Sequence, residues 1–302
     1  MEMSERCVAI GECMLELSGN TGDYQLGFGG DTLNAAIYMA RQGIPVGYLT
    51  ALGDDPYSEN MLDAWRAEGV STSLVRRLPG RLPGFYIIET DEEGDRSFHY
   101  WRDSSPAREL FDGPEGRDVL EQLLGFECLY LSGITLSLYT KDTLDMLLNF
   151  FHRYHDRGGS LVFDSNYRPG NWPSAESAST TFDRFLPFVK MALPSLEDEQ
   201  LLHSGATADT VMERYRSFGV QEVVVKNGPG GCLAWADEDC AEVYRHTFIP
   251  VEPLDTTAAG DSFNGSYLTA RMSGVSVVAA LKIAHGVASL VVQHRGAIIP
   301  KG

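Results

Sequence analysis

Short apolar segments alternate with amphipathic helical segments along most of the chain. The apolar segments have strand length and cover residues 8–10, 47–50, 128–131, 160–163, 191–193 and 222–225. The helical segments cover residues 32–42, 56–68, 141–157 and 209–218, and each is followed closely by a glycine, the residue that commonly ends a helix. Alternating strands and helices predict an α/β fold, in which a mostly parallel sheet has helices on both faces.

One region breaks this alternation. Residues 84–90 and 96–101 have the pattern of two strands around an acidic, glycine-containing turn at 91–95. The two strands carry the aromatic residues Phe85, Tyr86, Phe98, Tyr100 and Trp101, too many for a ribbon with both faces in water. Two interpretations stay open: a hairpin packed on the edge of the core, and a β lid over a cleft. Because no repeat or Pro/Gly/Ser linker divides the chain, we expect one domain spanning residues 1–302.

The charge balance narrows the classes of partner. The 302 residues include 42 acidic and 24 basic side chains, a net charge of −18, which repels nucleic acids and anionic membranes.

The apolar stretch 275–292 contains Lys282 and His285, so we expect a core helix there rather than a membrane span. The five cysteines show no CxxC spacing, and the N-terminus is polar. We therefore expect a reduced, cytoplasmic protein without a disulfide framework or a zinc site.

The strongest chemical motif is DTTAAGDSF at residues 255–263. Ala258, Ala259 and Gly260 precede a helical pattern, and small residues at a helix start let backbone N–H groups approach an anion. Asp261 would lie in the first helical turn, where it repels an anion unless it takes a proton from an attacking hydroxyl. Phosphoryl transfer combines an anion cradle, Mg²⁺ and such a base. Taken alone, the motif is equally compatible with an aspartate that only stabilises the helix N-terminus.

A second motif, GFGGD at residues 27–31, is followed by Asn34. Adjacent glycines let the backbone approach a polar ligand closely. Asp31 and Asn34 are three residues apart and would share a helix face that suits sugar hydroxyls. The alternative is a flexible turn with Asp31 near the helix N-cap. The spacing is not GxGxxG, so the dinucleotide-binding fingerprint is missing.

Two further segments place polar residues at the carboxyl ends of predicted strands, where open α/β sheets bind ligands. One is VVVKNGPGG at residues 223–231, a strand that runs into a glycine loop and could hold a nucleotide. The other is DSNYRP at residues 164–169, which contains Arg168. Together with Arg102, Tyr86 and Tyr100, Arg168 could recognise a carboxylate. A surface ion pair is the alternative for each arginine.

These motifs together resemble the ribokinase-like (PfkB) sugar kinases over essentially the whole chain. The family's signature Asp-Thr-x-Gly/Ala-Ala-Gly-Asp-Ser/Ala-Phe matches residues 255–263, and its Gly-Gly signature matches Gly29 and Gly30 with Asn34. The subgroup that phosphorylates 2-keto-3-deoxygluconate is suggested by IGECMLEL (10–17), GFGGDTLN (27–34), RLPGFYIIET (81–90), FHYWR (98–102), DSNYRP (164–169) and RGAIIP (295–300). The resemblance implies a three-layer α/β/α sandwich with a small β-sheet lid from about residues 12–26 and 84–102.

The resemblance also implies residue roles. ATP would phosphorylate the 6-hydroxyl of the sugar acid, with Asp261 as the base and Ala258, Ala259 and Gly260 as the anion hole, while the lid excludes water. The residues expected to bind the sugar acid are Gly30, Asp31, Asn34, Tyr86, Tyr100, Arg102, Arg168 and Asp261. The residues expected to line the ATP site are Asn166, Ser195, Lys226, Gly228, Gly230 and Gly231.

One departure from the family pattern concerns the metal. Many relatives have Asn-x-x-Glu in the segment that organises Mg²⁺ and its waters, whereas this chain has Ser195 and Asp198 at those places. We therefore expect Asp198 to act on Mg²⁺ through water. A monovalent cation near the anion hole is left open by the resemblance. Exposed lid edges make a homo-oligomer, a dimer or higher, the expected assembly.

Three alternatives stay open at this point. The substrate could instead be fructose or 2-keto-3-deoxygalactonate, bound by a kinase of the same fold. The chain could be a non-catalytic sugar-binding protein, although the intact segment 258–261 argues against that. A nicotinamide dehydrogenase shares the α/β pattern but needs the GxGxxG fingerprint that this sequence lacks.

Overall fold

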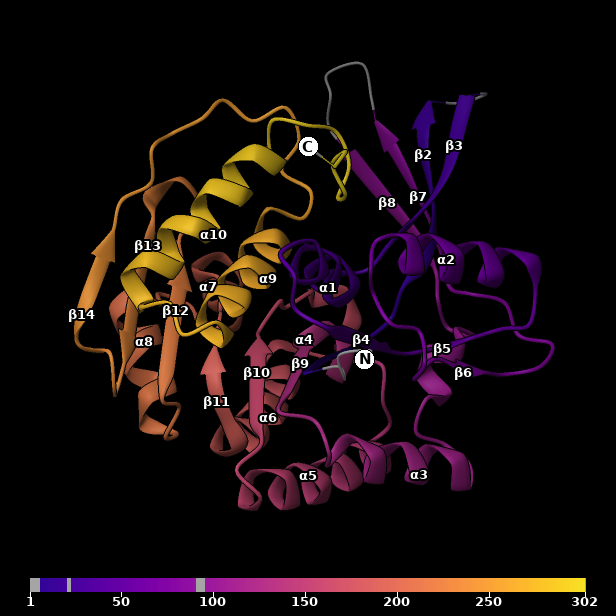
Figure 1. Ribbon diagram of the computed structural model, residues 1–302, viewed down its shortest axis with the longest axis horizontal. Coiled ribbons are helices and arrows are strands. Elements are labelled where there is room, and N and C mark those ends of the chain that lie inside the picture. The colour runs from indigo at the N-terminus through magenta and orange to yellow at the C-terminus, as the bar shows by residue number, and fades with distance from the viewer. Residues whose placement is uncertain (1–5, 21–22, 91–95, 302) are drawn as a thin grey trace.

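The centre of the molecule is an eight-stranded sheet. The computed structural model describes residues 6–20, 23–90 and 96–301, and the strand order in this sheet is β14-β13-β12-β11-β10-β9-β1-β4 (Figure 1). All six predicted strands are present, and they are parallel to one another: β1 (Cys7–Ile10), β4 (Val46–Leu49), β9 (Cys128–Ser132), β10 (Ser160–Asp164), β11 (Val189–Ala192) and β12 (Glu222–Lys226). Two antiparallel strands not predicted from the sequence, β13 (Cys232–Ala236) and β14 (Cys240–His246), extend one edge.

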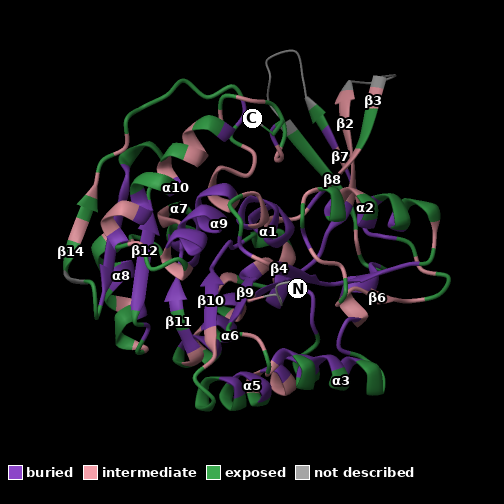
Figure 2. Ribbon diagram, viewed as in Figure 1, coloured by how far each residue is buried: buried purple, intermediate pink, exposed green. Residues whose placement is uncertain are grey.

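Both faces of this sheet are apolar, which is why the strands have nearly continuous hydrophobic sequences. In β1, Val8 and Ile10 belong to one buried cluster, and Cys7 and Ala9 to the other. The first cluster is covered by α3 (Gly113–Leu123), α4 (Gly133–Leu136), α5 (Lys141–Asp156), α6 (Ala175–Phe185), α7 (Leu196–Leu202) and α8 (Ala208–Ser217). The second is covered by α1 (Asp31–Arg41), α2 (Pro56–Ala67), α9 (Ala259–Met272) and α10 (Val277–Val291). The predicted three-layer α/β/α sandwich is confirmed, and Figure 2 shows the parallel strands buried, with helices such as α3, α5 and α10 exposing part of their surface.

The four helices predicted from periodicity, now α1, α2, α5 and α8, begin and end within one residue of their expected bounds. The apolar stretch 275–292 forms α10, as expected for a core helix. Within the described part of the chain, no helix combines the length and apolarity needed to cross a membrane.

A second, four-stranded sheet, which we call the lid, has the order β3-β2-β7-β8. Its strands are β2 (Met14–Asn20), β3 (Asp23–Gly29), β7 (Phe85–Thr90) and β8 (Arg96–Trp101). The predicted hairpin is confirmed as the antiparallel pair β7–β8, and its turn at 91–95 lies outside the described residues. The hairpin pairs with β2 rather than with the central sheet, which favours the lid over an edge hairpin. The first lid segment runs to Gly29, beyond the expected residue 26. That the whole chain forms one domain stays a prediction.

The remaining elements are short. They are the parallel pair β5 (Ala51–Leu52) and β6 (Arg76–Arg77) and the 3₁₀ turns η1 (Pro106–Glu109), η2 (Pro169–Asn171), η3 (Leu186–Phe188) and η4 (Gly228–Gly230).

The lid stands at the carboxyl edge of the parallel sheet. β1 ends at Ile10 and the chain enters β2 only four residues later, at Met14. Figure 1 shows the arrows of β10, β11 and β12 pointing toward the side of the molecule on which the lid stands. Polar residues that follow the parallel strands therefore face the space beneath the lid, which positions the candidate site there.

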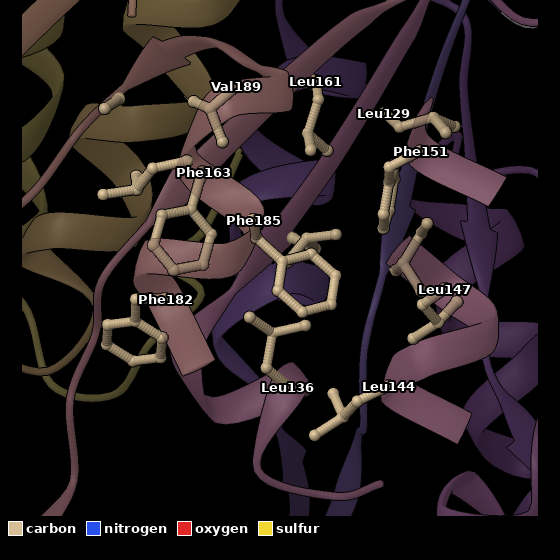
Figure 3. Close-up of a cluster of buried hydrophobic side chains, with 14 of the residues drawn as sticks. Leu129, Leu136, Leu144, Leu147, Phe151, Leu161, Phe163, Phe182, Phe185 and Val189 are labelled. Atoms are coloured by element: carbon tan, nitrogen blue, oxygen red, sulfur yellow. The ribbon is translucent and has the colours of Figure 1, made fainter. Parts of the chain in front are cut away.

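Aromatic side chains fill the layer between the sheet and α5 and α6, as Figure 3 shows. The rings of Phe163 and Phe182 have centroids 5.3 Å apart, and Trp172 lies edge-on to Phe182 at 5.5 Å. Phe182 is fully buried. Because this layer is close-packed, removing one ring leaves a cavity that the neighbours cannot refill.

We predict that Phe182→Ala lowers the free energy of unfolding by about 3–5 kcal/mol, because a buried ring is lost and a cavity remains. Urea denaturation followed by circular dichroism measures this change. Leu201→Ala, at a side chain that is 54% exposed on α7, is the matched control. It should change the free energy of unfolding by less than about 0.5 kcal/mol. Equal effects of the two substitutions would contradict the assigned packing.

Candidate active site

The N-terminus of α9 is shaped by the loop that precedes it. Ala258 has a φ of +57°, a left-handed conformation that is uncommon outside glycine. The buried carboxylate of Asp255 accepts hydrogen bonds from the backbone N–H groups of Thr257 (2.9 Å) and Gly296 (2.8 Å), which fixes the loop. Among the hydrogen bonds of the described residues, the N–H groups of Gly260 and Asp261 have no acceptor. Free N–H groups at the start of a 14-residue helix favour an anion.

Asp261 lies in the first turn of α9, as predicted, and is held from α1. The side-chain amide of Asn34 donates a hydrogen bond of 2.8 Å to its Oδ2 atom. The pKa of Asp261 is raised to about 7, mainly by burial and also by the charge of Asp31, while the hydrogen bond from Asn34 opposes the shift. A carboxylate with a pKa near neutrality is suited to accept a proton from a hydroxyl group.

A buried lysine lies beside this helix start. The ammonium group of Lys226, at the end of β12, donates to Asn264 (2.9 Å) and to Asp164 (3.2 Å). Asn264 also donates to Asp164 at 2.7 Å. A Cβ atom placed on Gly260 would lie 3.7 Å from the Lys226 nitrogen. Lys226, expected to line the ATP site, thus adds a fixed positive charge next to the free N–H groups of α9.

The structure brings together two residues that we expected to serve different ligands. Asn166, expected at the ATP site, donates a hydrogen bond of 2.7 Å to Asp31, expected at the sugar site. Asn166 has a φ of +27°, and it lies two residues after the end of β10. Burial raises the pKa of Asp31, and the hydrogen bond from Asn166 counteracts part of this shift. The expected sugar and nucleotide residues therefore adjoin each other at one edge of the sheet.

The two arginines expected to bind a carboxylate are each paired with an acid of the protein. Arg168 donates to Asp198 at 2.8 Å. Arg102, at the end of the lid, pairs with the buried Glu12 and donates to Asn171 at 3.3 Å. Asp198 is the third residue of α7, whose N-cap Ser195 accepts the Asp198 N–H at 3.2 Å. Ser195 thus caps a helix, and its predicted contact with a nucleotide stays a prediction.

The lid contributes two tyrosines to the same space. The rings of Tyr86 and Tyr100 have centroids 5.6 Å apart, and the Tyr86 hydroxyl donates to Glu16. Burial raises the pKa of Tyr100, while the positive charges of Arg102 and Arg168 oppose that shift. Both arginines are therefore close enough to act electrostatically on the Tyr100 hydroxyl.

Gly30 lies where the lid joins α1. It is the N-cap of α1, and any Cβ atom on it would collide with the backbone oxygen of Glu12. The glycine loop after β12 has two residues with positive φ, Gly228 (+47°) and Gly231 (+91°). A Cβ atom on Gly231 would collide with the backbone oxygen of His246, so this loop needs glycine for space as well as for conformation.

The family model described as pfkB family carbohydrate kinase matches residues 4–301. The chain belongs to this family.

Individual relatives agree with this membership. The chain is 43% identical over 304 residues to the 2-dehydro-3-deoxygluconokinase of Escherichia coli K12, covering 99% of this chain and 98% of that protein. Its fold is similar to the crystal structure of 2-dehydro-3-deoxygluconokinase from Thermotoga maritima, with a TM-score of 0.85 and 21% identity, covering 98% of this chain and 96% of that one. It is also similar to a ribokinase II from Escherichia coli in complex with ATP and Mg²⁺, with a TM-score of 0.83 and 22% identity, covering 97% and 94% of the two chains.

Sequence reasoning missed several residues that shape the site of this pfkB-family kinase. Asn264 lies three residues after Asp261, on the same helix face, and that spacing could have revealed it. Asp164 is the first residue of the motif DSNYRP, in which only Asn166 and Arg168 were expected to bind a ligand. Glu12 and Glu16 lie in the segment IGECMLEL, but nothing in the sequence indicates that their partners are Arg102 and Tyr86.

Within the described ranges, no group of three or more His, Cys, Asp or Glu side chains could hold a metal ion. Mg²⁺ usually keeps several waters and binds through one or two carboxylates together with substrate phosphates. The site of this pfkB-family kinase fits that mode, because two carboxylates, Asp164 and Asp198, lie at the same edge of the sheet. Asp164 forms an ion pair with the Lys226 side chain, and Asp198 forms one with Arg168.

We predict that Asp261→Asn stabilises the kinase above pH 7. The pKa of Asp261 is raised on folding, so wild-type stability falls as the pH rises from about 4 through about 7. The asparagine of the variant does not ionise, so the variant does not lose stability in this way. Its advantage in the free energy of unfolding should grow by about 2 kcal/mol between pH 5.5 and 8.5, measured by urea denaturation at each pH. A pH-independent difference would contradict the raised pKa of Asp261.

Proposed function

We propose that this chain is an ATP-dependent kinase that phosphorylates the 6-hydroxyl group of 2-keto-3-deoxygluconate. The observation that carries the proposal is the Asp261 carboxylate, held by Asn34 next to the free N–H groups at the start of α9. A base and an anion cradle at one point are what phosphoryl transfer to a hydroxyl requires. The 43% identity to a 2-dehydro-3-deoxygluconokinase over nearly the whole chain supports this choice of substrate.

In the proposed reaction, the 6-hydroxyl oxygen attacks the γ-phosphorus of ATP while its proton passes to Asp261. The bond between the γ-phosphorus and the oxygen that bridges it to the β-phosphorus breaks, and ADP leaves. The N–H groups of Gly260 and Asp261 and the ammonium group of Lys226 stabilise the charge on the transferred phosphoryl group. The expected anion hole also included Ala258 and Ala259. Among the described hydrogen bonds the Ala258 N–H has no acceptor, whereas the Ala259 N–H donates to the Thr256 oxygen at 3.2 Å, so Ala259 would contribute only its small side chain. Because Asp261 accepts the proton only when it is charged, turnover should rise with pH through about 7.

Sugar binding is assigned to residues on both sides of the cleft. Arg102 and Arg168 would hold the substrate carboxylate, with Tyr86 and Tyr100 as hydroxyl donors. Gly30, Asp31 and Asn34 would face the polyol end, which lies toward Asp261. We assign the carboxylate end of the substrate to Arg168, which pairs with Asp198, and the hydroxyl end to Asn34, which contacts Asp261.

Nucleotide binding is assigned to the other end of the site. Asn166, Ser195 and the loop Gly228, Gly230 and Gly231 would line the place of ATP, and the ribokinase II complex with ATP and Mg²⁺ supports both cofactors. When bound, Mg²⁺ neutralises phosphate charge. Asp198 would orient its waters, in place of the glutamate that many relatives have. Dependence on a monovalent cation stays a prediction.

The expected homo-oligomer also belongs to the proposal. The lid exposes large apolar side chains, among them Leu26 (54%) and Trp101 (58%). Exposed apolar side chains on a small sheet favour its burial against a second copy of the chain. The cytoplasmic location stays a prediction.

The proposed function is tested by a coupled ADP-release assay with Mg·ATP and a panel of 2-keto-3-deoxygluconate, 2-keto-3-deoxygalactonate, fructose, ribose and gluconate. We expect turnover to be confined to the two keto-deoxy acids and to be faster with the gluconate form. Asp261→Asn should lower kcat by about three orders of magnitude or more, because the base is lost, while calorimetry still detects sugar binding. Preference for fructose would contradict the substrate assignment. Absence of turnover with every compound would favour a non-catalytic sugar-binding protein.

We predict that Arg168→Gln raises KM for 2-keto-3-deoxygluconate by about 10- to 100-fold, because a charge-assisted hydrogen bond to the carboxylate is lost. The KM of a slowly phosphorylated neutral sugar should change by less than about threefold. Arg153→Gln is the matched control, since Arg153 forms a two-point ion pair with Glu121 at the exposed surface of α5. Equal losses for acidic and neutral sugars would contradict the role of Arg168.

A further inference from the structure

Glu12 is a buried acid that neither the predicted site nor the proposed reaction uses. Its side chain is 1% exposed, and its Oε2 atom pairs with the Nη2 atom of Arg102, whose side chain is 11% exposed. A buried carboxylate needs a compensating partner, and removal of one member of such a pair leaves the other charge unpaired. The Arg102 guanidinium is therefore held where it is by Glu12.

The pair connects the two places where the lid joins the body. Glu12 lies between β1 of the central sheet and β2 of the lid, and Arg102 is the first residue after β8, the last lid strand. Arg102 also donates to Asn171, three residues after Arg168, at 3.3 Å. The guanidinium thus bridges the entry of the lid, its exit, and the loop that carries the second arginine.

Each member of this ion pair has a second polar atom that could form a hydrogen bond to the other. Among the described residues, the Oε1 atom of Glu12 and the Nε atom of Arg102 are both buried without a hydrogen-bond partner. A carboxylate and a guanidinium can form two parallel hydrogen bonds, and the second one would join these two atoms. Gly84 packs against the first of these atoms, since a Cβ atom there would lie 3.1 Å from Oε1.

We propose that Glu12 is a positioning residue for sugar-acid recognition. Glu12 holds Arg102 by one edge of the guanidinium and so leaves its remaining N–H groups directed at the substrate carboxylate, beside Arg168 and Tyr100. The Glu12 carboxylate does not touch the substrate, because it is sealed from the cleft at 1% exposure. This role rests on the proposed function. It makes Glu12, through Arg102, a determinant of the preference for an acid over a neutral sugar.

The test is steady-state kinetics of Glu12→Gln with 2-keto-3-deoxygluconate and with ATP. Glutamine keeps the shape but offers only a neutral oxygen to Arg102, so we expect KM for the sugar acid to rise by about tenfold or more. We expect kcat and KM for ATP to change by less than about threefold. Glu12→Asp, which restores the charge, should recover a large part of the sugar affinity.

A double-mutant cycle and a control separate this role from a structural one. With Arg102→Gln in place, Glu12→Gln should raise KM for the sugar acid by less than about twofold, because the residue that it positions is gone. Glu222→Gln is the control, since Glu222 is also buried against an arginine, Arg271, but at the opposite end of the sheet. It should lower the melting temperature and leave KM for the sugar acid unchanged.

Three results for Glu12→Gln would overturn the proposal. They are a fall in melting temperature with an unchanged KM for the sugar acid, a lower KM for the sugar acid, and effects that add to those of Arg102→Gln in the double-mutant cycle. A wild-type enzyme that releases no ADP with any sugar acid would contradict the proposed function instead. In that case, calorimetric titration of the wild type and of Glu12→Gln with 2-keto-3-deoxygluconate still decides whether Glu12 supports binding.

Discussion

Three carboxylates, one buried and two partly buried, lie at one edge of the central sheet, and each accepts a hydrogen bond from the amide of one asparagine. Asn34 donates to Asp261, Asn166 to Asp31, and Asn264 to Asp164. Holding three carboxylates close together beside Lys226 is unfavourable unless neutral donors take up their lone pairs. The amide groups do so without adding charge. Asp261, whose pKa is raised to about 7, changes protonation near neutral pH. The hydrogen bonds to Asp31 and Asp164 tie the ends of α1, β10 and α9 together.

The parts of the fold that were predictable have local causes. Apolar strands and amphipathic helices closed by glycine gave the sandwich, and the DTTAAGDSF motif gave the start of α9 and the position of Asp261. Three of the missed elements are α6, β13 and β14. The buried positions of α6, Ala178, Thr181, Phe182 and Phe185, have helical spacing, so this helix could have been predicted from its sequence. β13 and β14 turn back antiparallel after a glycine loop, which breaks the alternation of strand and helix on which the prediction relied.

The parts of the site that were not predictable depend on tertiary pairing. Glu12 and Arg102 are 90 residues apart, and Arg168 and Asp198 are 30 apart, so neither pair has a local pattern. The sequence indicated that arginines of suitable position were present, but it could not show that each already has an acidic partner. The contact of Asn166 with Asp31 could not be predicted from the sequence either, because it depends on how β10 and α1 are placed relative to each other.

Gly265 has a consequence for how the enzyme can move. It lies on α9 one turn after Asp261, and a Cβ atom there would collide with the backbone oxygen of Ala35 on α1. The backbones of the two helices are therefore in direct contact, with no side chain between them to adjust. At this point α1 and α9 pack without an intervening side chain, and the two helices carry Asn34 and Asp261. A shift of α1 toward α9 has no side chain to absorb it, so the contact between the asparagine and the base depends on glycine at position 265.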